Sequence, residues 1–263
     1  VITTRIAWLI ARGVARPHEI LAVTFTNRAA REMHERVRNM VPEAEGVLIR
    51  TFHSFCAYLL RRHAEEARLD PHFTIYDDDD SVSLLGTCFE GLEKSEIKRY
   101  ARLISRAKDY LLGPDDDLLG ISSDPELDAV YRAYQDRLDA MGNCDFGDLI
   151  ARVVMLLRNN GEIRSRLQER FRFVLVDEYQ DSNVAQFHLL KALYGPETAL
   201  CVVGDDDQSI YRFRGAEVRN ILEFPDEFPD TRIVRLERNY RSTAPILELA
   251  SAIVAKNSGR LGK

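Results

Sequence analysis

The chain has 263 residues, of which 45% are hydrophobic, and its formal net charge is −6 at pH 7. This length predicts one or two domains, and the acidic balance argues against a protein that coats DNA by charge alone. The sequence contains no apolar run long enough to span a membrane and no secretory signal, so we expect no membrane partner. Four scattered cysteines without a Cys-x-x-Cys pair favour a reduced, cytoplasmic compartment and argue against a structural metal.

Five short apolar runs, each followed by a polar or aromatic cluster, predict a parallel β-sheet. They are Ile20–Val23, Val47–Ile49, Phe173–Val176, Ala199–Val203 and Ile233–Leu236. A helical pattern follows each run, which is typical of a doubly wound α/β fold. The carboxyl ends of parallel strands share one edge of the sheet, where ligands bind. We therefore expect the polar clusters to meet at one functional site.

Two adjacent carboxylates, Asp177 and Glu178, end the run Phe173–Val176. An Asp at a strand end suits Mg²⁺, which takes one or two carboxylates together with phosphate oxygens. A Glu beside it is placed to orient an attacking water molecule. The alternative is a strand end followed by a helix, with Asp177 or Asp181 as the helix cap. This segment alone leaves both interpretations open.

Helical patterns replace the strand runs in the middle of the chain. Glu93–Leu112 and Leu127–Met141 have apolar residues at a period close to 3.6. We therefore predict that residues 70–141 form an all-α subdomain. It would be inserted into an α/β domain made of residues 1–69 and 142–263.

Six short stretches of the chain are more specific as an ordered set than any one of them is alone. They are Ala22–Met33 (AVTFTNRAAREM), Thr51–Cys56 (TFHSFC), Asp145–Ile150 (DFGDLI), Leu175–Asn183 (LVDEYQDSN), Val202–Ala216 (VVGDDDQSIYRFRGA) and Leu236–Thr243 (LERNYRST). This ordered set spans nearly the whole chain and resembles the motor core of a UvrD/Rep/PcrA-type superfamily 1 DNA helicase. The resemblance implies a RecA-like P-loop NTPase fold, in which helices flank a parallel sheet and a helical accessory subdomain is inserted.

The resemblance also implies an ATP-dependent enzyme that uses Mg²⁺, and it assigns roles to individual residues. Asp177 would hold Mg²⁺ through a water molecule, Glu178 would orient the hydrolytic water, and Gln208 would sense the γ-phosphate. Arg241 would stabilise charge in the transition state, and Tyr240 would stack on adenine. For Tyr240 and Arg241 the alternative is a helix start with a packed aromatic ring. Phosphoryl transfer depends mostly on positioning and charge neutralisation, which is what such residues provide.

Single-stranded and partly duplex DNA would bind along the same edge of the sheet. Aromatic side chains provide platforms for bases, and basic or polar side chains contact phosphates. The candidates are Thr24, Phe25, Asn27, Thr51, His53, Tyr211, Arg212, Phe213 and Arg214. Phe25 could equally be a core residue, since a Phe at a strand end is more often buried than exposed. Position 213 is more often Trp in this family, so Phe213 offers a smaller platform.

One part of the family pattern is missing, because the sequence contains no G-x-x-x-x-G-K-[ST] phosphate loop. We interpret the chain as part of a helicase without its first strand and phosphate loop, followed in the full-length protein by a second motor domain. The alternatives are a non-catalytic DNA-binding or scaffolding module derived from the same fold, or a helicase with a downstream nuclease domain. The resemblance alone implies 3′ to 5′ movement, a role in DNA repair or replication, and a place in the bacterial cytosol or nucleoid.

On this interpretation the 263 residues alone should show no significant ATPase activity. The missing phosphate loop and second motor domain would remove contacts to the transferred phosphate. The loss of such transition-state contacts typically lowers turnover by a factor of about 10³ or more. DNA-stimulated phosphate release by the purified chain checks this, and turnover near helicase rates would contradict it.

Overall fold

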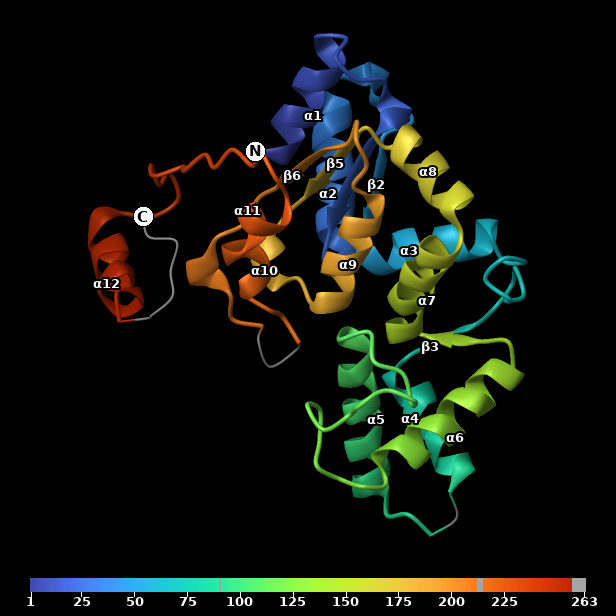
Figure 1. The fold of residues 1–263 in the computed structure, drawn as a ribbon. Helices are drawn as coiled ribbons and strands as arrows, with labels where there is room; N and C mark the ends of the chain where they lie inside the picture. The colour runs from blue at the N-terminus through green and yellow to red at the C-terminus, as the bar shows by residue number, and fades with distance from the viewer. Residues whose placement is uncertain (90, 212–214, 257–263) are drawn as a thin grey trace.

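The computed structural model describes residues 1–89, 91–211 and 215–256. At its centre lies a four-stranded parallel sheet with the strand order β2-β1-β5-β6 (Figure 1). The strands are β1 (Ile20–Thr24), β2 (Leu48–Thr51), β5 (Phe173–Val176) and β6 (Ala199–Val202). Val23, Val176 and Val202 lie side by side in register, so the residues that follow them leave the sheet at one edge. This architecture confirms the predicted α/β class.

The predicted fifth strand, Ile233–Leu236, is absent. Residues 231–239 have no regular secondary structure, and the side chains of Ile233, Val234 and Leu236 are 55%, 68% and 70% exposed. A strand needs a neighbouring strand to pair its backbone groups and to help bury its side chains. Within the described residues the sheet ends at β6, and no strand lies beside this segment. The apolar run was therefore a misleading signal, and the prediction was wrong.

Helices cover both faces of the sheet. They are α1 (Ile2–Ala11), α2 (Asn27–Met40), α3 (Phe52–Arg62), α7 (Phe146–Asn159), α8 (Gly161–Arg170) and α9 (Val184–Leu193). Leu21 and Val23 of β1 pack into the larger hydrophobic cluster with α3, α7 and α9, whereas Ile20 and Ala22 pack against α1 and α2. Successive side chains of a strand point to opposite faces, so a strand covered on both sides reads as a continuous apolar run.

A separate helical layer, which lies below the sheet in Figure 1, has its own hydrophobic cluster. It consists of α4 (Asp78–Cys88), α5 (Lys94–Asp109) and α6 (Leu127–Ala140). Two short strands, β3 (Ile75–Tyr76) and β4 (Cys144–Asp145), pair in parallel where the chain enters and leaves this layer. The helical layer agrees with an all-α insertion, while the boundaries at residues 70 and 141 stay a prediction.

Short helices and turns complete the described part of the chain. They are η1 (Pro17–Glu19), η2 (Pro42–Ala44), η3 (Tyr179–Asp181), η4 (Asp206–Gln208), α10 (Arg219–Leu222), α11 (Phe224–Glu227) and α12 (Ala244–Val254). Ile221, Phe224 and Phe228 join the larger hydrophobic cluster, whereas α12 lies to one side and buries none of its residues (Figure 1). Among the helices of the described residues, none combines the length and apolar character needed to cross a membrane.

Candidate functional site

A cavity of about 500 Å³ lies at the carboxyl edge of the sheet. Its lining consists of Asp177, Glu178, Val203, Gly204, Asp205, Gln208, Arg238, Asn239, Tyr240 and Arg241. All five residues predicted for the nucleotide site are in this lining, although they come from three separate parts of the sequence. The structure therefore brings together Asp177, Glu178, Gln208, Tyr240 and Arg241, and their individual roles stay predictions.

The backbone turns sharply at the two adjacent carboxylates that follow β5. The Asp177 amide still donates to the Val23 carbonyl at 3.0 Å, as in the sheet. Glu178 has a left-handed φ of 52°, which is rare for a residue other than Gly and often marks a functional position. The helix that follows, α9, is capped by Asn183, whose Oδ1 accepts a hydrogen bond from the Gln186 amide at 2.9 Å. The carboxylates are therefore not the cap of that helix.

The two carboxylates create an electrostatic environment that suits a divalent cation. Burial, and then the neighbouring charge of Glu178, raise the pKa of Asp177. A cation would offset both effects, since it compensates desolvation and like-charge repulsion. No cluster of three or more His, Cys, Asp or Glu side chains in the described ranges could hold a metal. Asp177 and Glu178 offer carboxylate oxygens, and Mg²⁺ takes one or two carboxylates together with water and phosphate oxygens.

Gln180, which is only 2% exposed, connects the ends of β5 and β6. Its Nε2 donates to Glu178 Oε2 at 2.9 Å, and its Oε1 accepts from the Asp205 amide at 3.1 Å. Gly204 permits this approach, because a Cβ there would lie 2.7 Å from Gln180 Oε1. Gln208 Nε2 then donates to Asp205 Oδ2 at 2.7 Å. A continuous chain of polar contacts thus links Glu178 with Gln208. Gln180 was not among the residues predicted from the sequence, although it lies within the LVDEYQDSN stretch.

Tyr240 and Arg241 are presented to the cavity by a tight turn. Asn239 Oδ1 accepts hydrogen bonds from the Arg241 amide at 2.8 Å and from the Ser242 amide at 2.9 Å. The Tyr240 side chain is 84% exposed, and the Arg238 guanidinium lies 5.1 Å from the centre of its ring. Tyr240 is therefore not a packed aromatic residue at a helix start. An exposed ring beside a cation remains available to stack on a ligand.

A second cavity, of about 470 Å³, lies between the ends of β1 and β2 and the start of α7. Its lining consists of Phe25, Asn27, Arg50, Thr51, His53, Ser54, Ala57, Tyr58, Arg61, Ile75, Phe146 and Leu149. Four of the predicted DNA-binding residues line it, together with two arginines and further aromatic rings. This mixture of rings and cations is typical of surfaces that grip single strands.

The predicted DNA-binding residues in β1, β2 and their following turns are not equally accessible. The Phe25 ring packs edge-on against Phe52 at 5.4 Å, so it belongs both to the core and to the cavity wall. Thr51 Oγ1 accepts from the Ser54 amide at 3.2 Å and caps α3. Thr24 is only 1% exposed and does not line the cavity. A role for Thr24 in DNA binding stays a prediction without support from its position.

Of the predicted candidates that follow Gln208, only Tyr211 belongs to the described residues. Tyr211 is 38% exposed and lines neither cavity. Arg212, Phe213 and Arg214 lie outside the described residues, so their proposed contacts with DNA stay predictions.

Phe146 is a candidate that the sequence analysis missed. Its side chain is 46% exposed, and its ring meets the His53 ring edge-on with the centroids 5.5 Å apart. Burial lowers the pKa of His53, which favours the neutral imidazole, and this side chain offers hydrogen bonds and a ring face. The signal was available in the DFGDLI stretch, where an aromatic residue stands between Asp145 and Gly147 at the start of a helix.

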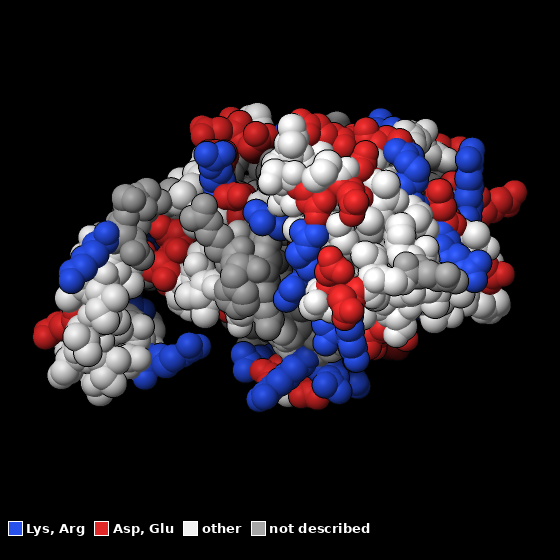
Figure 2. Space-filling model, turned by 90° about the horizontal axis from the view of Figure 1, so that it is seen from below, with Lys and Arg blue, Asp and Glu red and all other residues white. Residues whose placement is uncertain are grey.

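Charge is distributed over the surface in small groups. Figure 2 shows basic side chains gathered at several places among acidic ones, without a single broad basic stripe over this face. This pattern fits the net charge of −6.

Asp109 is a partly buried carboxylate at the end of α5, and it is hydrogen-bonded to Asn183, which caps α9. Asn183 Nδ2 donates to Asp109 Oδ1 at 2.6 Å, and burial raises the pKa of Asp109 to about 7 from an ordinary value of 3.8. The protonated group favours folding, so its contribution to stability should fall as the pH rises from 3.8 to about 7.

Asp109→Asn should therefore flatten the pH dependence of stability, because the amide cannot ionise and still accepts the Asn183 hydrogen bond. Thermal melting of both proteins across this pH window measures the effect. Parallel curves for the two proteins would show that Asp109 does not titrate there.

Comparison with known proteins gives one consistent result. The profile of the UvrD/REP helicase N-terminal domain matches residues 1–229. The chain is 45% identical over 282 residues to ATP-dependent DNA helicase UvrD1 of Mycobacterium tuberculosis, and 42% identical over 275 residues to DNA helicase II of Rickettsia typhi. It is 40% identical over 270 residues to ATP-dependent DNA helicase PcrA of Bacillus subtilis. These alignments cover 100% of this chain but only 36%, 41% and 36% of the respective relatives.

Proposed function

Because the chain belongs to the UvrD/REP helicase family, we propose that it supplies part of a DNA helicase driven by hydrolysis of Mg-ATP. It would move 3′ to 5′ on single-stranded DNA and unwind duplex DNA during repair or replication in the bacterial cytosol. The observation that carries this proposal is the gathering of Asp177, Glu178, Gln208, Tyr240 and Arg241 around one cavity. A purely scaffolding module would need none of these side chains to converge.

Each side of the first cavity would serve a different part of the nucleotide. Asp177 would hold Mg²⁺ through water, and the ion would neutralise charge on the phosphates when it is bound. Glu178, lifted from the strand by its left-handed turn, would orient the attacking water. Arg241 would neutralise charge that develops on the transferred phosphate, and the exposed Tyr240 ring would stack on adenine. The second motor domain would close over this cavity in the full-length protein.

The chain of contacts through Gln180 offers a physical route between the nucleotide and the DNA. Gln208 lies at one end of this chain and is followed directly by the segment that contains Tyr211. A displacement of Gln208 by the γ-phosphate would move that segment. We infer that this is how hydrolysis is coupled to movement along the strand.

The second cavity would receive a base of single-stranded DNA. Phe146 and Phe25 would provide ring faces, and Arg50 and Arg61 would lie near the phosphates. Stacking on aromatic rings tolerates any sequence, because every base has a π-face. This property suits a motor that must move along arbitrary DNA.

Phe146→Ala tests this assignment most directly. In the full-length gene product it should weaken single-strand binding by about 1–3 kcal/mol, because one stacking platform is lost. Fluorescence anisotropy with a labelled oligothymidylate measures the dissociation constant, and ATP binding should be unchanged. Trp8→Ala is a matched control, since Trp8 is a 54% exposed aromatic residue that lines neither cavity. Equal DNA affinities for the unmodified protein and both variants would rule out the second cavity as the DNA site.

A further inference from the structure

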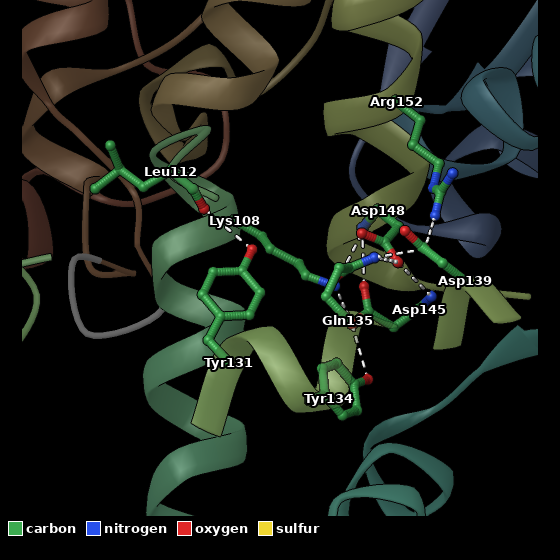
Figure 3. A network of polar contacts seen from close by, with 9 residues as sticks. All are labelled: Lys108, Leu112, Tyr131, Tyr134, Gln135, Asp139, Asp145, Asp148 and Arg152. Carbon is green, nitrogen blue, oxygen red and sulfur yellow. Dashed lines mark hydrogen bonds and ion pairs between the residues drawn. The ribbon is translucent and has the colours of Figure 1, made fainter. Parts of the chain in front are cut away.

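An ammonium group is buried at the junction between the inserted helices and the sheet domain. Lys108, in the last turn of α5, is only 2% exposed. Its Nζ lies 2.6 Å from Asp145 Oδ2 and 2.8 Å from Asp148 Oδ1 (Figure 3). A buried charge of this kind is tolerated only with close opposite charges, and removal of one partner leaves the others uncompensated. The three groups therefore form one buried, ion-paired unit.

The two carboxylates also build the first turn of α7. Asp145 Oδ1 accepts from the Asp148 amide at 2.8 Å, and Asp148 Oδ2 accepts from the Asp145 amide at 3.4 Å. Each carboxylate thus caps the helix with one oxygen and binds Lys108 with the other. Gly147 allows the Lys108 side chain to approach this turn closely, since a Cβ at position 147 would lie only 2.7 Å from the Lys108 Cβ. The Lys108 stem therefore lies directly against the backbone of this turn.

Side chains of α6 enclose the ammonium from the other side. Tyr134 Oη donates to Asp145 Oδ2 at 2.9 Å, and the Tyr134 ring centre is 5.2 Å from Lys108 Nζ. Arg152 of α7 forms an ion pair with Asp139 of α6 (Figure 3). The network therefore ties α5 and α6 to the start of α7, and it involves two different elements of the insertion.

Phe146 occupies the position between Asp145 and Gly147 in this same turn. While the two carboxylates bind Lys108, the Phe146 ring meets His53 and lines the second cavity. The first turn of α7 thus has one side fixed to the helical insertion and another side in the candidate DNA cavity. Any loosening of the Lys108 contacts would change the direction of the Phe146 ring.

We propose that Lys108 is a positioning residue for DNA binding, which clamps the first turn of α7 so that Phe146 presents its ring to a base. The helical insertion then shapes the single-strand site without touching the base itself. This inference rests on the proposed function of the second cavity. It adds a residue outside that cavity that determines how well the cavity works.

A double-mutant cycle separates positioning from simple stabilisation. Lys108→Met keeps the aliphatic stem and removes the charge, and it is combined with Phe146→Ala in the full-length gene product. With oligothymidylate as the probe, Phe146→Ala should weaken binding by about 5- to 150-fold in the unmodified background. In the Lys108→Met background the same change should weaken binding less than about threefold, because the ring is already misplaced and the two effects are coupled.

Two further variants protect this test from a folding artefact. Lys108→Met leaves two buried carboxylates unpaired, so the neutral variant Lys108→Met/Asp145→Asn/Asp148→Asn is measured in parallel. It should melt close to the unmodified protein, and it too should reduce the effect of Phe146→Ala. Arg99→Met is the control, because Arg99 is a cation on the same α5 that pairs with Asp124 at the surface. In the Arg99→Met background the effect of Phe146→Ala should be unchanged.

The outcomes distinguish this inference from the function on which it rests. A full-sized effect of Phe146→Ala in both the Lys108→Met and the neutral backgrounds would overturn the positioning role alone. No DNA binding by the unmodified protein, or no effect of Phe146→Ala in it, would overturn the proposed DNA cavity and the inference with it. A reduced effect in both Lys108 backgrounds, with a full effect in the Arg99→Met background, supports the proposal.

Discussion

Glu178→Gln in the full-length gene product should lower ATP hydrolysis by about 10² or more, which is the range for the loss of a positioned base. The change removes the charge that would orient the water in the proposed function, but it keeps the size of the side chain. It also keeps the local structure, because Gln180 Nε2, which now donates to Glu178 Oε2, can donate to the amide oxygen of the variant. Nucleotide binding should remain, since the proposed function assigns the phosphate and Mg²⁺ contacts to other groups.

Single-turnover hydrolysis and equilibrium binding of a non-hydrolysable ATP analogue measure the two effects separately. Glu223→Gln is a suitable control, because Glu223 is an exposed carboxylate that does not line the first cavity. A loss of nucleotide binding together with turnover would instead make Glu178 a structural residue or a direct metal ligand.

The strands that could be predicted from the sequence are those whose pattern is local. Each of Ile20–Val23 and Phe173–Val176 is apolar throughout, because helices bury both faces of the central strands. The polar residues that follow these strands were expected at one edge of the sheet, because the carboxyl ends of parallel strands lie at the same edge. The convergence of Asp177, Glu178 and Gln208 around the first cavity follows from the same topology, whereas Tyr240 and Arg241 reach it from a segment that is not a strand.

The local sequence pattern gave wrong or no predictions where a structure depends on a partner that is distant in the sequence. Ile233–Leu236 has the composition of a strand but no neighbouring strand in the described part of the structure. The pairing of β3 with β4 involves only two residues on each side, which is too short to give a periodic signal. Lys108 follows Ile104 by four residues on the apolar face of its helix, but only the fold shows that Asp145 and Asp148 compensate its buried charge.

The sequence also could not show which aromatic side chains are buried and which are exposed. Phe52 and Phe146 both stand at the first position of a helix that follows a short strand. Phe52 is 1% exposed and belongs to the core, whereas Phe146 is 46% exposed and lines a cavity. The two side chains differ in burial because of their neighbours. Phe52 packs against Phe25, whereas the Lys108 side chain lies against Gly147 in the turn that carries Phe146.

Arg241→Ala should have the largest effect of any single change at the first cavity. In the proposed function the guanidinium would neutralise charge on the transferred phosphate, and an arginine in that role contributes about 10³ or more to turnover. We therefore expect kcat for DNA-stimulated hydrolysis to fall by about 10³, with a much smaller change in the affinity for ATP. Arg241→Lys should recover only part of this loss, since lysine keeps the charge but not the planar fork of donors.

Arg238→Ala provides the matched comparison, because Arg238 is a second cation in the same cavity, three positions earlier in the chain. Its guanidinium lies over the Tyr240 ring at 5.1 Å, so its loss should disturb the ring that would hold adenine. We expect Arg238→Ala to raise KM for ATP and to lower kcat less than about tenfold, because cation–π contacts of exposed groups are weak. Steady-state kinetics at saturating single-stranded DNA measure both parameters for both variants. Equal losses of kcat in the two variants would mean that the cavity needs only positive charge, and that Arg241 has no specific role in the transition state.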